Sequence, residues 1–118
     1  MRNLLVDTDV FIDHIRGARK LNASRDELHY SVVTRCELFA GKNADEDSLR
    51  LLLSAFREIP VDSITAETAG RLRRAINIPT PDAIIAATAL INNLVLFTRN
   101  YKDFKSVKRL KIASQEQT

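Results

Sequence analysis

Short apolar segments alternate with helical segments along this chain, and this alternation restricts the possible folds more than any other feature. Apolar runs typical of buried strands occur at residues 4–6, 30–33 and 94–98, and weaker ones at 59–61 and 110–113. Alternation of this kind predicts an α/β domain, with a central parallel sheet of four to five strands and helices on both faces.

Helical patterns fill the intervals between the predicted strands. Residues 49–56 place leucine or phenylalanine at positions i, i+3, i+4 and i+7, which indicates an amphipathic helix. The nearly all-apolar segment 83–92 predicts a central helix, with Thr80 as its N-cap and Pro81 in its first turn. Shorter or weaker patterns predict helices at 10–15, after Thr34, and from Thr65 onward.

The bulk composition is that of one ordinary globular domain spanning residues 1–118. The chain is 45% hydrophobic with only 3 glycines and 3 prolines, and it contains no internal repeat. Cys36 is its only cysteine, which rules out an internal disulfide and a thiolate metal cage. The first apolar run is stopped at once by Asp7, so we expect no membrane span and a cytoplasmic location.

Four acidic residues follow the predicted strands. Asp7 ends the first strand, Glu37 lies in the helix after the second, Asp82 opens the apolar helix, and Asp103 follows the fourth strand shortly after Asn100. Ligands of an open α/β sheet collect at the carboxyl ends of its strands. We therefore expect these four acids to converge on one rim of the sheet.

Each acid also has a purely structural explanation. Asp7 and Asp82 can stabilise the N-termini of helices, and Glu37 can be an ordinary solvated helix residue. Taken together, however, several carboxylates at one rim repel one another unless a cation neutralises them. Oxygen ligands without a cysteine or histidine cluster favour Mg²⁺ or Mn²⁺, and such an ion can activate water for phosphoryl chemistry.

Three stretches of the chain resemble PIN-domain proteins, in particular the VapC-type toxins of toxin–antitoxin pairs. They are LLVDTDVFIDHIRG, SVVTRCELFAG and PDAIIAATALINNLVLFTRNYKDF, in the order in which the family has them. The resemblance implies a single PIN-like domain with the activity of a Mg²⁺- or Mn²⁺-dependent endoribonuclease. Such an enzyme cleaves RNA, commonly tRNA or rRNA, and thereby inhibits translation.

The resemblance also implies roles for individual residues. Asp7 and Asp82 match positions usually assigned as metal ligands, and Glu37 matches an acid that helps to hold metal or water. For the fourth acid we favour Asp103, with Asn100 as a nearby polar contributor to the catalytic set. The question of which of these two residues completes the site stays open at this point.

The implied partners are an RNA substrate, a cognate VapB-like antitoxin and a second copy of the chain in a homodimer. The net charge of +3 and the pI near 9.3 suit a polyanionic partner, although only mildly. Basic residues cluster after the proposed site and can either bind phosphates or form a solvated basic segment: Lys102, Lys105, Lys108, Arg109 and Lys111.

Two other readings of the sequence remain open. The segment Asp7-Thr8-Asp9-Val10 also fits the first motif of haloacid-dehalogenase-like phosphatases, although their later lysine motif and acidic pair are not evident. The chain can also be a non-catalytic module that binds only RNA or an antitoxin. Asp9 stands where PIN-domain proteins often have asparagine, so its charge is not expected to be essential.

Overall fold

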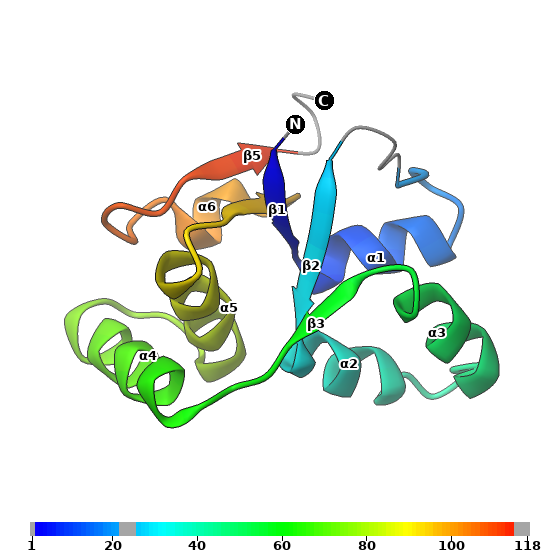
Figure 1. Ribbon diagram of the computed structural model, residues 1–118, viewed down its shortest axis with the longest axis horizontal. Helices are drawn as coiled ribbons and strands as arrows, with labels where there is room; N and C mark the ends of the chain where they lie inside the picture. Colours follow the sequence, from blue (N-terminus) through cyan, green and yellow to red (C-terminus); the bar gives the residue numbers. More distant parts are fainter. Residues whose placement is uncertain (1, 22–25, 115–118) are drawn as a thin grey trace.

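A computed structural model describes residues 2–21 and 26–114 of the chain (Figure 1). The strands are β1 (Asn3–Val6), β2 (Glu27–Ser31), β3 (Arg57–Ile59), β4 (Val95–Thr98) and β5 (Ile112–Ser114). The helices are α1 (Thr8–Ile15), α2 (Val32–Phe39), α3 (Glu46–Leu53), α4 (Ser63–Ala75), α5 (Thr80–Ile91) and α6 (Tyr101–Phe104). Within the described ranges, no helix is both long and apolar enough to cross a membrane.

All five strands pair in parallel, in the order β3-β2-β1-β4-β5. Alternate residues of the central strands contribute to two separate cores. Leu5 and Leu96 pack in a cluster with residues of α4 and α5, whereas Leu4 and Phe97 pack in a cluster with residues of α1, α2 and α3. Figure 1 shows these two groups of helices on opposite sides of the sheet. The predicted fold class, with five strands and both faces covered, is confirmed.

The direction of the chain through the sheet reverses at its centre. From β1 the chain continues outward to β2 and β3, and it then returns to β4 on the other side of β1. The pairing of β1 with β4 continues one residue past the end of β1, because the amide of Asp7 donates to the carbonyl of Phe97 at 2.9 Å. Such a reversal opens a crevice at the carboxyl ends of the two strands, where α/β proteins bind their ligands.

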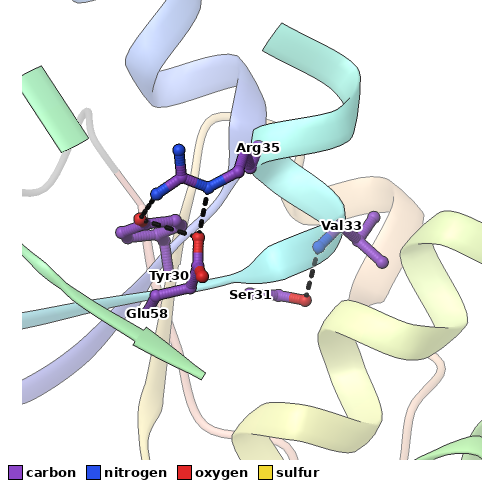
Figure 2. Close-up of polar contacts among 5 residues, drawn as sticks. All are labelled: Tyr30, Ser31, Val33, Arg35 and Glu58. Carbon is purple, nitrogen blue, oxygen red and sulfur yellow. Dashed lines mark hydrogen bonds and ion pairs between the residues drawn. The ribbon is translucent and has the colours of Figure 1, made fainter. Parts of the chain in front are cut away.

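The second strand ends earlier than the sequence predicts. A strand at residues 30–33 with a helix cap at Thr34 is wrong, because β2 ends at Ser31 and α2 begins at Val32. The hydroxyl of Ser31 accepts a hydrogen bond from the amide of Val33 at 3.1 Å (Figure 2). This cap satisfies an otherwise unpaired helix amide and overrides the strand preference of two consecutive valines.

A buried tyrosine joins three elements at the β3 edge of the sheet (Figure 2). Tyr30 of β2 donates its hydroxyl hydrogen to Glu58 of β3 at 2.9 Å and accepts from Arg35 of α2 at 3.0 Å. The guanidinium of Arg35 also pairs with Glu58 directly. The three-residue strand β3 is thus held to both β2 and α2 by side chains as well as by its backbone pairing.

Two further predictions need correction, and one element was not predicted. The third strand lies at residues 57–59 rather than 59–61, so Pro60 follows it and removes no backbone donor from the sheet. Helix α5 has Pro79 rather than Thr80 at its N-cap and has no side-chain cap there. The four-residue helix α6 was not predicted, because a single turn is too short to show a periodic pattern. The edge strand near residues 110–113 is confirmed as β5.

Candidate active site

Asp7 occupies the junction between β1 and α1, where it is the N-cap of the helix. One carboxylate oxygen accepts from the amide of Thr8 at 2.8 Å, and the other accepts from the hydroxyl of Thr98 at 2.8 Å. The residue is only 5% exposed. Burial and the nearby charge of Asp9 raise the pKa of Asp7 to about 7, although the two hydrogen bonds act in the opposite direction.

The end of β4 contributes a buried hydroxyl and a cation to the same place. Thr98 accepts a hydrogen bond from the amide of Asn100 at 3.0 Å, and its hydroxyl donates to Asp7 at 2.8 Å, with Asp9 as a more distant acceptor at 3.4 Å. Arg99 pairs with the buried carboxylate of Asp13 at 2.7 Å, and its backbone amide lies 3.5 Å from Asp9. These contacts dock α1 onto the end of β4 and hold the carboxylate of Asp7 in place.

Neither Thr98 nor Arg99 was singled out from the sequence. Their only signal is their position, directly at the carboxyl end of a central strand. Asp9 is 9% exposed, and burial raises its pKa although Arg99 lowers it. The structure therefore places a second carboxylate beside Asp7, at a position for which the sequence predicted no essential charge.

Asp82 lies in the first turn of α5 and is half-buried. Burial raises its pKa most, followed by the negative charges of Asp103, Glu37 and Asp9. Asp82 also adds to the charges that raise the pKa of Asp7. The charges of Glu37 and Asp103 thus reach Asp82 and that of Asp82 reaches Asp7, so the four acids expected at one rim lie near one another, and Asp9 belongs to the same cluster.

The remaining candidates lie at the exposed border of this cluster. Glu37 projects from α2, and its Oε1 accepts a hydrogen bond from the hydroxyl of Thr8 at 2.6 Å. Asp103 lies in the first turn of α6, and Asn100 precedes that helix without forming a side-chain cap. No contact of the Asn100 side chain distinguishes it from Asp103 as the fourth member, and the charge of Asp103 on Asp82 favours Asp103.

A cavity of about 490 Å³ adjoins the acids between α6 and the segment that leads into α5. Asp82 and Asp103 line it together with Lys102, which is the first residue of the predicted basic cluster. Apolar and neutral polar side chains complete its wall: Ile76, Asn77, Pro79 and Ser106. The cavity therefore combines carboxylates with one cation, at a size that accommodates part of an extended polymer.

The donor atoms at this rim are all oxygens. Among the described residues, no group of three or more acidic, histidine or cysteine side chains is arranged so that it could hold a metal ion. The crowding of carboxylates around the buried Asp7 nevertheless fits a hard cation, because a positive charge would offset both the burial and the mutual repulsion. The chemistry of the donors therefore suits Mg²⁺ or Mn²⁺ rather than zinc.

Comparison with known proteins agrees with this geometry. The PIN domain family profile matches residues 4–110. "Ribonuclease VapC10" of Mycobacterium tuberculosis is 39% identical over 92% of this chain and 90% of its own length. A solved "Toxin-antitoxin complex from Klebsiella pneumoniae" is 31% identical, with a TM-score of 0.75 over 93% of this chain and 95% of that one.

A VapBC2 structure from Rickettsia felis, bound to a promoter DNA fragment, has a TM-score of 0.79 at 22% identity and shares the fold. It covers 95% of this chain and 98% of that chain. The chain belongs to the PIN-domain family and, within it, to the VapC ribonucleases. This membership excludes the haloacid-dehalogenase-like phosphatase considered from the first motif.

Proposed function

We propose that this protein is a Mg²⁺- or Mn²⁺-dependent endoribonuclease and the toxin of a VapBC-type pair. The observation that carries the proposal is the carboxyl of Asp7 at the crevice of the sheet, where burial and, after it, the charge of Asp9 raise its pKa to about 7. Relatives named as ribonucleases match over nearly the whole chain, which supports the same reaction here.

Asp7 and Asp82 are the residues proposed to hold the metal, with Glu37 and Asp103 as further oxygen ligands and Asn100 as a neutral neighbour. A divalent ion held there would lower the pKa of a bound water and stabilise the charge that develops on the phosphate. Of the two candidates for the fourth position we propose Asp103, because its charge acts on Asp82.

The protein's own contribution is to keep these groups fixed and to position the RNA. The hydrogen bonds from Thr8 and Thr98 leave Asp7 with little freedom to rotate, so it does not need to be ordered during the reaction. Lys102 lies in the adjoining cavity, where its ammonium group can contact a phosphate next to the one that is cleaved. We propose tRNA or rRNA as the substrate class.

The proposed partner is a VapB-like antitoxin, since the solved structures that resemble this chain include toxin–antitoxin complexes. A groove of about 510 Å³ among α1, α2 and α3 is lined by apolar residues, such as Ile12 and Leu52, and also by charged ones, such as Lys42 and Glu37. An apolar antitoxin segment seated there would reach the acids directly. Homodimer formation stays a prediction, which sedimentation of the purified protein tests.

The decisive experiment is cleavage of structured RNA by the purified protein. We expect cleavage in Mg²⁺ or Mn²⁺, loss of cleavage in EDTA, and a fall of at least about 100-fold in Asp7→Asn and Asp82→Asn, as for the loss of groups that act directly on the reaction. Asp47→Asn is the matched control, because the Asp47 side chain is 99% exposed on α3. Full activity of Asp7→Asn and Asp82→Asn would show that the proposed site is wrong. RNA that binds but stays intact across a metal series would indicate a non-catalytic binding module.

A further inference from the structure

Glu37 is held in place by a residue of another helix. Its side chain is exposed on α2, yet its Oε1 lies 2.6 Å from the hydroxyl of Thr8 at the start of α1. The backbone amide of the same Thr8 donates to Asp7 at 2.8 Å. One buried residue therefore contacts two of the proposed metal-binding carboxylates, one through its amide and the other through its hydroxyl.

The directions of the hydrogen bonds around Thr8 follow from counting protons. A carboxylate only accepts, so the single hydroxyl proton of Thr8 is donated to Glu37. The hydroxyl of Thr34 lies 2.9 Å from that of Thr8, and this contact must then have Thr34 as the donor. The result is a directed chain of two hydrogen bonds, from Thr34 to Thr8 and from Thr8 to Glu37.

The two threonines that begin this series of hydrogen bonds have little conformational freedom. Thr34 is fully buried and Thr8 is 7% exposed, and both are β-branched residues with few rotamers in a helix. A glutamate on an exposed helix face, by contrast, has three rotatable bonds and loses conformational entropy when it is fixed in one position. The hydrogen bond from Thr8 stabilises the conformer in which the Glu37 side chain faces the acid cluster.

We propose that Thr34 and Thr8 form a hydroxyl relay that positions Glu37 for the ribonuclease reaction. The inference rests on the proposed function and assigns Thr8 and Thr34 as positioning residues, because their hydroxyls would act through Glu37. The charge that Glu37 exerts on Asp82 agrees with a side chain held toward the cluster rather than free in solvent.

The activity test compares Thr8→Val, which removes the hydroxyl at nearly constant shape, with Thr8→Ser, which keeps it. We expect Thr8→Val to lower kcat about 10-fold with little change in KM, and Thr8→Ser to stay within about 3-fold of the wild type. Titration with Mn²⁺ alone should show weaker binding in Thr8→Val only. Equal kcat and equal Mn²⁺ affinity in Thr8→Val and the wild type would overturn the proposal.

The same substitution made in a Glu37→Ala variant separates an effect on the position of Glu37 from a general loss of structure. If Thr8 acts through Glu37, adding Thr8→Val to Glu37→Ala should not lower kcat further, since the relay then has no acceptor. Thr65→Val is the matched control. Thr65 is also a buried threonine that donates to a carboxylate, that of Asp62 at 2.7 Å, but it lies on α4. We expect this control to lower stability without lowering kcat, and an equal loss of kcat in both valine variants would contradict the relay.

Crystal structures of the metal-free variants test the relay independently of any ribonuclease activity. Glu37 should keep its contact with residue 8 in the wild type and in Thr8→Ser, and it should turn toward solvent in Thr8→Val. An unchanged Glu37 conformer in Thr8→Val would overturn the relay even if the protein cleaves RNA. Absence of cleavage by the wild type would overturn the proposed function while leaving this structural result in force.

Discussion

The carboxyl group of Asp7 is buried at the N-terminus of α1, and burial together with the charge of Asp9 raises its pKa from 3.8 to about 7. A folded-state pKa above that of the unfolded chain means that ionisation of Asp7 opposes folding. The destabilisation that ionised Asp7 causes is absent below pH 4, grows as the pH rises toward 7, and is constant above that. The residue proposed to be essential for catalysis therefore destabilises the metal-free protein at neutral pH.

Replacement of this carboxyl by a neutral amide should therefore stabilise the protein while it abolishes cleavage. At pH 8 in EDTA we expect Asp7→Asn to exceed the wild type by roughly 2–4 kcal/mol, as a shift of about three pKa units implies. At pH 4 the two proteins should differ by less than about 1 kcal/mol. Urea unfolding at the two pH values measures the difference, and Asp47→Asn should show no such pH dependence because that residue is exposed. An Asp7→Asn protein less stable than the wild type at pH 8 would contradict the role of burial.

The positions of two of the acids could be predicted from the sequence, whereas the hydrogen bonds that orient the acids could not. Asp7 and Asp82 follow from the order of strands and helices, because one caps the start of a helix at the expected rim and the other lies in the first turn of a helix there. The hydroxyls of Thr8 and Thr98 did not follow from it, since a threonine carries no periodic signal that separates a hydrogen-bond donor in a site from a core residue. Such contacts join residues up to 91 positions apart in the chain and depend on the finished fold.

At the scale of elements, the three-residue edge strand β3 depends on side chains for its attachment. The hydroxyl of Tyr30 lies between Arg35 of α2 and Glu58 of β3, as Figure 2 shows. Tyr30 is 1% exposed, whereas its two partners are each about one-third exposed. The tyrosine hydroxyl therefore links a buried strand to an ion pair that water partly screens.

Tyr30→Phe should remove this link and lower the stability of the protein by about 1 kcal/mol, the usual net value of one hydrogen bond. The value is modest because water can replace the hydroxyl beside the ion pair, whose members are each about one-third exposed. The midpoint of urea unfolding measures the loss. Tyr101→Phe provides the control, because Tyr101 is 53% exposed and the same change there should stay within about 0.5 kcal/mol. Equal effects of the two substitutions would show that the β3 attachment does not depend on Tyr30.

Two of the helix starts that the sequence pattern did not predict lie directly after a capping side chain. Val32 and Val33 are β-branched and extend an apolar run, so the pattern favours a strand, but the serine cap before them starts a helix. Similarly, the aspartate cap at Asp45 places the start of α3 at Glu46, and the helix ends at Leu53 before the last residue of its predicted apolar pattern, Phe56. At these two starts a local capping contact decides the boundary, and a hydrophobic pattern alone does not contain such a contact.

At the scale of the whole molecule, the order of the strands determines where the acids meet. The fold class followed from the alternation of strands and helices, because a parallel sheet with both faces covered is the usual way to bury such segments. The strand order β3-β2-β1-β4-β5 did not follow from it, and this order is what brings the ends of β1 and β4 side by side. Asp7 and Thr98 are neighbours for that reason alone.

Because the acid cluster opposes folding of the metal-free protein, binding of a divalent ion should stabilise the entire domain. At a free Mn²⁺ concentration 100 times the dissociation constant, linkage predicts a gain of about 2.7 kcal/mol, which corresponds to a rise of several degrees in Tm. At one fixed Mn²⁺ concentration the gain should be larger at pH 8 than at pH 5, because Mn²⁺ competes with the proton on Asp7, whose pKa is about 7. Thermal unfolding with Mn²⁺ and with EDTA measures this effect. Asp7→Asn and Asp82→Asn should lose most of it, whereas Asp47→Asn should keep it. An unchanged Tm of the wild type up to millimolar Mn²⁺ would contradict a metal site in the crevice. The negative charge of the cluster would then need another cation to balance it, such as a basic side chain of the antitoxin.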